Sequence, residues 1–311
     1  MGPGAEFDLV RAMLARLGPI ASGIGDDCAF IDSAFNDSAG ASAMCVSTDL
    51  SIENVHFRRG WLTPAEIGYR ATTAALSDLA AVAASPIGIL IALGVPEQWR
   101  GDLPDIADGI ADAARSANTV VLGGDTTGAD RLTIGVTVLG TSRTPLRRSG
   151  ARAGDALYVT GELGGPGSAL RAFLAGDEPS TRARARFARP VARLREALWL
   201  ANAGATSAID ISDGLSADVA HLAAASGVRI RIDLDRLPLL AEARVDAASS
   251  GEEYELAITA PQSLDVAAFA REHDVPLTRV GEVLEDGDPG VDVWLDGERV
   301  DPPRGHDHFS R

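Results

Sequence analysis

Lysine is absent from this chain of 311 residues, so all 28 basic side chains are arginines. This absence excludes the phosphate-loop lysine of Walker-type ATPases, the strand lysine of protein kinases and any Schiff-base mechanism. The two cysteines, Cys28 and Cys45, are too few for a disulfide framework or a four-thiolate zinc site. A phosphate-bearing substrate would therefore have to be neutralised by arginine, by backbone N–H groups or by metal ions.

Long apolar runs are also missing. The most apolar segment, residues 87–95, is too short to form a membrane-spanning helix, which takes ~20 residues. Residues 1–6 lack the basic region and apolar core of a signal peptide. The sequence therefore predicts a cytoplasmic protein without a membrane partner.

The composition is that of a globular protein, with 46% hydrophobic and 23% charged residues. A chain of this length exceeds what one compact core usually organises, so two domains are expected. The formal net charge of −16 disfavours nucleic acid as a partner, because phosphate backbones are bound by basic faces. An acidic balance is what we expect if several carboxylates hold cations.

Apolar runs of strand length alternate with helical patterns, which predicts an α/β fold. Thr63 can cap a helix, Pro64 suits its first turn, and Glu66 can close a capping box. A polar, arginine-rich stretch lies around 142–154, so the sequence predicts domains at 1–145 and 146–311. We expect strands at 41–48, 87–94, 119–122, 132–141, 155–160, 206–211, 228–234, 255–259, 277–283 and 291–295, and helices at 6–17, 63–84, 102–116 and 214–226.

Aspartates recur where apolar runs end. The segment Gly-Gly-Asp-Thr-Thr at 123–127 follows the apolar run 119–122, which predicts a buried strand with Asp125 at its tip, facing a cleft. A solvated Asp in a tight turn is the alternative interpretation of this segment alone. An apolar run followed by Asp with Gly, Ser or Thr also occurs at 23–27, 46–49 and 209–214.

A buried carboxylate is predicted within the helix 63–84, because Asp78 interrupts a sequence made mostly of Ala and Leu. An isolated buried carboxylate costs several kcal/mol or becomes protonated, so it must be paired or metal-bound. The alternative is a hydrogen bond to a neighbouring loop.

Clustered acids of this kind would repel one another and raise their own pKa values. Hard cations remove that cost, since Mg²⁺ binds carboxylates and substrate phosphates. The pattern therefore favours phosphoryl transfer, in which catalysis is mostly positioning and charge stabilisation. A metal hydrolase and a non-catalytic protein stay open, although the five histidines form no H-x-x-x-H-type pair. The candidate acids are Asp26, Asp27, Asp49, Asp78, Asp125, Asp210 and Asp213.

Six motifs, in order along essentially the whole chain, together resemble the thiamine-monophosphate kinase family. This family belongs to the superfamily of aminoimidazole ribonucleotide synthetase, selenophosphate synthetase and the hydrogenase-maturation carbamoyl-dehydrating protein. Each motif is weak by itself, but six in register are specific. They are Gly23-Ile24-Gly25-Asp26-Asp27, Ser47-Thr48-Asp49 with Val55-His56-Phe57, Leu76-Ser77-Asp78-Leu79-Ala80, Gly123-Gly124-Asp125-Thr126, Arg148-Ser149-Gly150-Ala151 and Ile209-Asp210-Ile211-Ser212-Asp213-Gly214-Leu215.

The resemblance implies a two-domain α/β (α+β) fold. Its N-terminal domain would bind ATP and Mg²⁺ and form a shared β-barrel across a homodimer, and its C-terminal domain would close over the cleft. It also implies direct transfer of the γ-phosphoryl group of ATP to thiamine monophosphate, giving thiamine diphosphate.

The resemblance further implies roles for particular residues. Expected Mg²⁺ ligands, direct or through water, are Asp27, Ser47, Thr48, Asp49, Asp78, Asp125, Asp210 and Asp213, of which Asp27, Asp49, Asp78, Asp125 and Asp210 would assist catalysis. Expected nucleotide contacts are Gly124, Asp125, Arg148 and Ser212, and expected substrate contacts are His56, Glu252 and Phe309. No general base is expected, because a phosphate acceptor is already ionised at pH 7.

This chain departs from the family pattern at three places. The segment Ser250-Gly251-Glu252-Glu253 stands where the family has Gly-Gly-Glu-Asp, so Ser250 adds a Cβ and Glu253 is longer. His306 occupies the place of an aromatic that could stack on thiamine, which leaves that role to His306 or Phe309. Ala107 lies near the position of a tyrosine that the family often places beside adenine.

Two alternatives remain beside the kinase. The chain could be another ATP-using member of the superfamily, although Cys28 resembles a small buried hydrophobe more than the reactive cysteine of a selenophosphate synthetase. It could also be an ATP-binding regulator that has lost catalysis, against which the complete set of acids argues.

Overall fold

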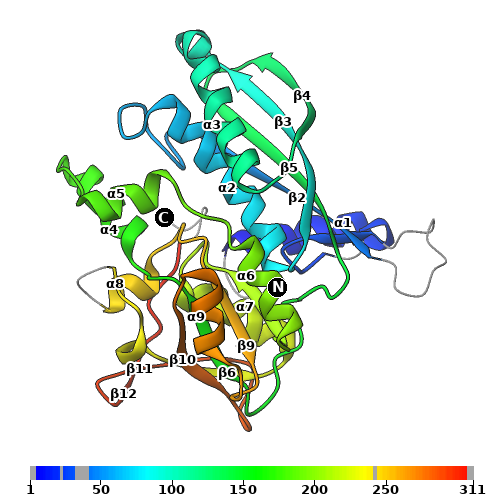
Figure 1. The fold of residues 1–311 in the computed structure, drawn as a ribbon, viewed down its shortest axis with the longest axis vertical. Coiled ribbons are helices and arrows are strands. Elements are labelled where there is room, and N and C mark those ends of the chain that lie inside the picture. The colour runs from blue at the N-terminus through cyan, green and yellow to red at the C-terminus, as the bar shows by residue number, and fades with distance from the viewer. Residues whose placement is uncertain (1–4, 22–23, 32–41, 241–243, 307–311) are drawn as a thin grey trace.

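The computed structural model describes residues 5–21, 24–31, 42–240 and 244–306, except for the side chains of residues 6, 7 and 19. Within these ranges the chain forms a five-stranded sheet followed by a seven-stranded sheet (Figure 1). The first sheet uses residues between 29 and 142, and the second uses residues between 156 and 300. No helix in the described ranges is long and apolar enough to cross a membrane.

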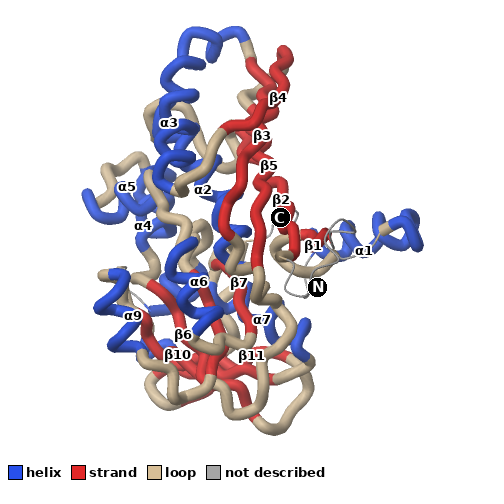
Figure 2. Tube along the Cα trace, turned by 45° about the vertical axis from the view of Figure 1, so that its right-hand side comes forward, coloured by secondary structure: helices blue, strands red, loops and turns tan. Residues whose placement is uncertain are grey.

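The first sheet has the spatial order β1-β2-β5-β3-β4, and only the β3–β4 pair is parallel. Helices α2 and α3 cover one of its faces, and Figure 2 shows no described helix over the opposite side of β3, β4 and β5. Its elements are α1 (Ala5–Leu17), η1 (Gly18–Ile20), β1 (Ala29–Ile31), β2 (Ala43–Ile52), α2 (Pro64–Ala81), β3 (Ser85–Val95), η2 (Glu97–Asp102), α3 (Leu103–Ser116), β4 (Val121–Gly128) and β5 (Thr133–Ser142).

Helix α2 begins as the sequence predicts. The Thr63 hydroxyl accepts a hydrogen bond from the backbone N–H of Glu66 at 3.2 Å, and the Glu66 carboxylate accepts one from the Thr63 N–H at 2.8 Å. This capping box satisfies two of the N–H groups that a helix start leaves without partners. The helix is largely buried, as expected, and ends at Ala81, three residues before the predicted end at 84.

Strand pleating gives the first sheet a helix-covered face and an open face. Ile89, Ile134 and Val136 are fully or almost fully buried beneath the helices. Leu50 and Leu90, on the opposite face, are 53% and 40% exposed. Side chains alternate between faces along each strand, so the same strands supply both a core and an uncovered apolar surface.

The second sheet has the order β12-β11-β8-β10-β6-β9-β7, and its strands β6, β9 and β7 are buried on both faces. Along β6, Ala156 and Tyr158 join the core that includes α6 and α9, whereas Leu157 and Val159 join the core that includes α7 and α8. Its elements are β6 (Ala156–Thr160), α4 (Gly165–Ala175), α5 (Thr181–Ala188), α6 (Leu194–Asn202), β7 (Ser207–Asp210), α7 (Leu215–Ser226), β8 (Arg229–Asp233), η3 (Leu234–Arg236), α8 (Arg244–Ser249), β9 (Leu256–Ala260), α9 (Val266–His273), β10 (Leu277–Leu284), β11 (Gly290–Leu295) and β12 (Glu298–Val300).

Two expectations about β4 are not met, namely that it is buried and that it ends before Asp125. The segment 119–122 was predicted to be a buried strand ending before Asp125, but β4 runs from Val121 to Gly128 and is exposed along its length. Asp125 therefore lies inside an edge strand and not at a strand tip. The described strands of one chain form no closed barrel, and the barrel implied by the resemblance is one that two copies of the chain would share.

Candidate metal and substrate site

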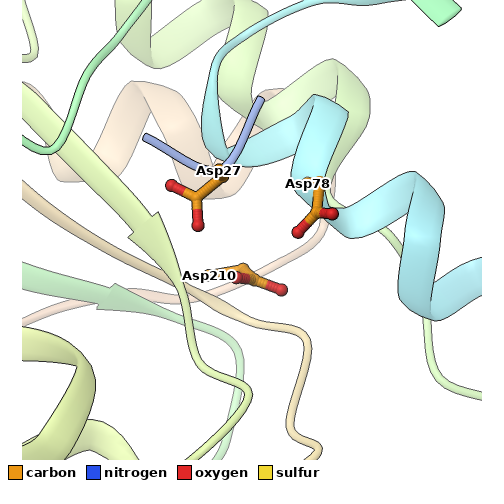
Figure 3. A group of neighbouring side chains, drawn as sticks. All are labelled: Asp27, Asp78 and Asp210. Atoms are coloured by element: carbon orange, nitrogen blue, oxygen red, sulfur yellow. The ribbon is translucent and has the colours of Figure 1, made fainter. Parts of the chain in front are cut away.

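Three aspartates from distant parts of the chain meet between the two sheets. Asp27 lies in the loop before β1, Asp78 on α2 and Asp210 at the end of β7. One carboxylate oxygen from each lies within 4.8 Å of the others, and Figure 3 shows the three side chains turned toward one another. Carboxylate oxygens gathered in this way match the ligand preference of Mg²⁺.

Each of these carboxylates has a neighbour that holds it in place. The Ser47 hydroxyl on β2 donates to Asp78 Oδ2 at 2.5 Å, and the Ser77 hydroxyl donates to Asp210 Oδ2 at 2.6 Å. The guanidinium of Arg148 pairs with Asp27, with Nη2 2.6 Å from Oδ1. Nε of the same guanidinium lies 3.2 Å from Asp27 Oδ2, so both oxygens of Asp27 accept from Arg148, and one of them lies within 4.8 Å of the other two acids.

The electrostatics of the cluster favour a bound cation. Burial, and then the charges of Asp210 and Asp27, raise the pKa of Asp78 well above its usual range. Burial and the charge of Asp27 raise the pKa of Asp210 to about 7, although the Ser77 hydroxyl and Arg148 oppose the rise. A bound divalent cation reverses such shifts, because it favours the ionised carboxylates. The donor set and its burial therefore fit Mg²⁺.

A cavity of about 500 Å³ adjoins these acids. Its acidic lining is Asp49, Asp78, Asp210, Asp213 and Glu252, and its apolar lining includes Val55, Ala74, Pro166, Leu170 and Leu174. The rest of the polar lining is His56, Arg171, Ser212, Ser249, Ser250, Tyr254, Arg304 and His306. A cavity with carboxylates and an apolar wall suits a ligand that carries both a metal-bound phosphate and an organic ring system.

The loop at 212–214 is held by a residue that the sequence analysis did not single out. Asp218, in the first turn of α7, accepts hydrogen bonds from the backbone N–H groups of Ser212, Asp213 and Gly214 at 3.1, 3.1 and 3.0 Å. Gly214 has a φ of 119°, which a residue with a Cβ rarely adopts. These hydrogen bonds thus hold the backbone of the loop in a conformation in which Ser212 and Asp213 line the cavity.

Most of the predicted metal ligands come together. Asp27, Asp78 and Asp210 form the trio, Ser47 is hydrogen-bonded to it, and Asp49 and Asp213 line the same cavity. Asp49 lies within β2 and not at its end, so its side chain reaches the cavity from the middle of a strand.

Two of the predicted ligands, Thr48 and Asp125, lie on the other face of the first sheet. Asp49 is in register with Val136, Ile91 and Gly124, and this row faces the helices. The neighbouring row of paired residues contains Asp125 and Leu50 and faces the open side of the sheet. Thr48 also lies on the open face, where its hydroxyl is 3.0 Å from the Thr137 hydroxyl. Within one chain, their side chains therefore lie across the sheet from the trio.

The predicted nucleotide and substrate residues are placed in different ways. Arg148 is paired with Asp27, and Gly124 lies on the edge strand β4, outside the cavity lining. His56 lines the cavity with its ring oriented by a hydrogen bond of 3.1 Å from the Ile52 N–H to Nδ1. Glu252 lines it too but forms an ion pair with Arg70. Phe309 lies outside the described residues.

The two departures in the loop 250–253 have structural explanations. The Ser250 hydroxyl accepts a hydrogen bond from the Gly167 N–H at 2.9 Å, which ties the loop to the start of α4. Glu253 is fully buried and accepts from the Gly164 N–H at 2.6 Å, while burial raises its pKa to about 8. Glu253 therefore supports the cavity wall and does not line it.

Sequence reasoning missed Arg70, Ser77 and Asp218. The sequence does carry a signal for Arg70, since it is a charged residue in the same apolar stretch as Asp78. Ser77 directly precedes Asp78, and Asp218 lies four residues after Gly214 in the following helix. Local sequence patterns could not identify the partners of these residues, since Ser77 and its partner Asp210, for example, are 133 residues apart.

Known proteins resemble the chain over nearly its whole length. The family models for AIR synthase related protein match residues 25–142 with the N-terminal domain and residues 152–293 with the C-terminal domain. Thiamine-monophosphate kinase of Pyrococcus horikoshii is 38% identical over 265 residues, which cover 83% of this chain and 82% of the relative. The same enzyme of Escherichia coli strain K12 is 34% identical over an alignment of 324 residues, covering 98% and 96%.

A solved structure gives the same result for the fold. AaThiL complexed with AMPPCP and TMP has a TM-score of 0.85 and 29% sequence identity, covering 98% of this chain and 97% of that chain. The two mixed α/β halves thus have an AIR synthase-like fold. By its sequence relatives and its architecture, the chain belongs to the thiamine-monophosphate kinase family.

Proposed function

We propose that the protein transfers the γ-phosphoryl group of ATP to the phosphate of thiamine monophosphate. A phosphate oxygen of the acceptor forms a bond to the γ-phosphorus, the bond to the β,γ-bridging oxygen breaks, and thiamine diphosphate and ADP leave. The observation that carries this proposal is the buried trio Asp27, Asp78 and Asp210 beside a cavity with an apolar wall.

The trio, with Asp49 and Asp213 on the cavity wall, supplies the residues that would hold Mg²⁺. Bound Mg²⁺ would neutralise the phosphates and stabilise charge as it develops during the transfer. The chain itself fixes the acids through Ser47, Ser77 and Arg148. No general base is needed, because the acceptor phosphate is ionised at pH 7.

The substrate is proposed to lie along the cavity, with its phosphate at the acids and its rings against the apolar wall. His56 and Glu252 are placed to contact it, and Ser212 and Arg148 lie near enough to the acids to contact nucleotide phosphates. The domain division at 145/146, a cytoplasmic location and the lack of a nucleic-acid partner are part of the same proposal.

Product analysis tests this function. The protein is incubated with ATP, Mg²⁺ and thiamine monophosphate, and ADP and thiamine diphosphate are quantified. We expect equal amounts of the two products, and none of either when a chelator removes the metal. ADP without thiamine diphosphate would favour another substrate of the superfamily. Nucleotide binding without any turnover would favour a regulatory protein.

A homodimer is proposed on the open face of the first sheet. Leu90 lies there on β3, beside the exposed edge strand β4 in which Leu122 is 56% exposed, and Leu50 lies on the same face on β2. Contiguous apolar surface of this kind marks an interaction site, and an edge strand that stays unpaired favours aggregation. A second copy facing this surface would cover it, form the shared barrel and place Gly124 and Asp125 at the interface.

Replacing Leu90 with glutamate should convert the dimer into monomers, because it would bury a charge at the centre of the proposed interface. Sedimentation equilibrium should give twice 32.2 kDa for the wild type and 32.2 kDa for Leu90→Glu. Val191→Glu, which also changes an exposed apolar residue but lies outside the first sheet, should stay dimeric. A monomeric wild type would refute the proposed interface.

A further inference from the structure

One side of helix α2 carries all the contacts that this helix makes with the candidate site. Arg70, Ala74, Ser77 and Asp78 recur at helical spacing and so share a face. Asp78 belongs to the trio, Ser77 donates to Asp210, Ala74 lines the cavity, and Arg70 pairs with Glu252. At 1.5 Å per residue, Arg70 and Asp78 lie ~12 Å apart along the axis.

Arg70 is a buried cation held by two hydrogen bonds and a ring contact. The residue is 2% exposed, its guanidinium lies 4.0 Å from the centre of the Phe187 ring, and it donates to the Phe187 carbonyl oxygen. Its other terminal nitrogen donates to Glu252 Oε2. A planar guanidinium suits this combination of ring stacking and directional bonds better than a lysine ammonium would.

Glu252 belongs to a backbone segment that needs support. Glu252 and Tyr254 have φ values of 60° and 52°, in the left-handed region that residues other than glycine rarely adopt. Their N–H groups donate to the carbonyl oxygens of Ser212 and Ile211 at 2.7 and 2.9 Å. The backbone is therefore held by the second half of the chain, whereas the Glu252 side chain is held by Arg70 of the first half.

We propose that Arg70 is a positioning residue for the thiamine monophosphate end of the cavity. It fixes the Glu252–Tyr254 wall relative to Asp78, so a substrate whose rings rest on that wall has its phosphate in register with the trio. This inference rests on the proposed function of the cavity. It also changes the expected role of Glu252, whose carboxylate is already committed to Arg70 and is not available as an unshared counter-ion for the substrate.

The test compares Michaelis constants for the two substrates. Arg70→Met keeps an unbranched apolar stem but removes the charge and the hydrogen-bond donors of the guanidinium. We expect its KM for thiamine monophosphate to rise about 10- to 100-fold, because displacement of a binding wall by about 1 Å has effects of that size. The KM for ATP should change less than about threefold. The KM of Arg70→Lys for thiamine monophosphate should lie between those of the wild type and Arg70→Met. Lysine restores the positive charge but not the planar arrangement of guanidinium donors.

Arg184→Met is the matched control. Arg184 on α5 makes two hydrogen bonds of 2.7 and 2.9 Å to Glu66 at the start of α2, so it also joins the two halves but does not line the cavity. This variant should leave the KM for thiamine monophosphate within twofold of the wild type. The double variant Arg70→Met with Glu252→Gln should be less impaired than the product of the two single effects, because both changes break one contact.

Several results would overturn the inference. Arg70 would have only a structural role if Arg70→Met left the KM for thiamine monophosphate unchanged or raised both KM values equally. Multiplicative effects in the double variant would lead to the same conclusion. If Arg70→Met fails to fold, Arg70→Lys and Glu252→Gln decide, and both must raise that KM. If the wild type binds thiamine monophosphate without producing thiamine diphosphate, the proposed function fails, and dissociation constants measured by equilibrium dialysis still test Arg70.

Discussion

Replacing Asp78 with asparagine should lower kcat by at least about 10³-fold, equivalent to about 4 kcal/mol of transition-state stabilisation. Asp78 is at the centre of the candidate site, since it contributes to the trio and also lines the cavity. Asparagine preserves the shape but removes the charge that attracts the cation. Retained activity at ordinary Mg²⁺ concentrations would contradict the assigned role.

The same variant should not be destabilised when divalent cations are absent. Burial and the neighbouring acids raise the folded-state pKa of Asp78, so the folded protein binds more protons than the unfolded chain between the two pKa values. Stability therefore falls as the pH rises through that window, and a neutral asparagine avoids this penalty. Thermal unfolding at pH 7 should give an equal or higher Tm for Asp78→Asn without Mg²⁺.

In the same unfolding experiment, added Mg²⁺ should raise the Tm of the wild type more than the Tm of Asp78→Asn. The wild type should gain stability, because the cation binds the folded state, whereas Asp78→Asn should gain much less. Asp105→Asn, at an exposed position in the first turn of α3, is the control for an aspartate-to-asparagine change and should behave like the wild type. An equal Mg²⁺-dependent gain in all three would place the cation elsewhere.

Replacing Gly109 with alanine should destabilise the protein by about 2 kcal/mol or more, although alanine is the better helix former by ~1 kcal/mol. Gly109 lies where α3 crosses α2, and a Cβ there would be 1.8 Å from the Ala65 carbonyl oxygen. Gly68 on α2 is equally confined, since its Cβ would be 2.1 Å from the Ile106 carbonyl oxygen. The helices can touch at this depth only because both positions are glycine.

The effect should extend to catalysis, because α2 carries Asp78. Separating the helices would displace α2 relative to the second sheet, and a shift of about 1 Å at reacting groups can cost about 10²-fold in rate. Urea unfolding and kcat/KM should therefore both decline in Gly109→Ala. Gly101→Ala, where a Cβ would meet no atom within 4 Å, should change stability by less than about 0.5 kcal/mol. Equal stability of both variants would refute the close crossing.

Local patterns explain why much of the fold could be predicted from the sequence. The capping box at Thr63 and Glu66 and the alternating pattern of β8 depend on residues a few positions apart. Asp78 could be singled out because a carboxylate in an apolar helix needs a partner wherever the helix packs. These features follow from local spacing and burial, which the sequence displays directly.

The remaining parts depend on strand register and on distant contacts. Ser47, Thr48 and Asp49 were grouped as ligands, but the pleat sends Thr48 to the opposite face of β2. The apolar run 119–122 predicts a strand that ends before Asp125, whereas β4 is an edge strand that includes this residue. The Arg70–Glu252 pair joins residues 182 positions apart, which no local pattern indicates.

Mn²⁺ binding to the wild type and to Asp210→Asn, followed by electron paramagnetic resonance in the presence of AMPPCP, tests the central claim most directly. Asp210 is 4% exposed and belongs to the trio, so its loss removes one carboxylate without opening the surface. If the trio holds the cation, Asp210→Asn should weaken Mn²⁺ binding by more than about tenfold. Unchanged affinity and an unchanged number of bound ions would show that the trio is not the metal site.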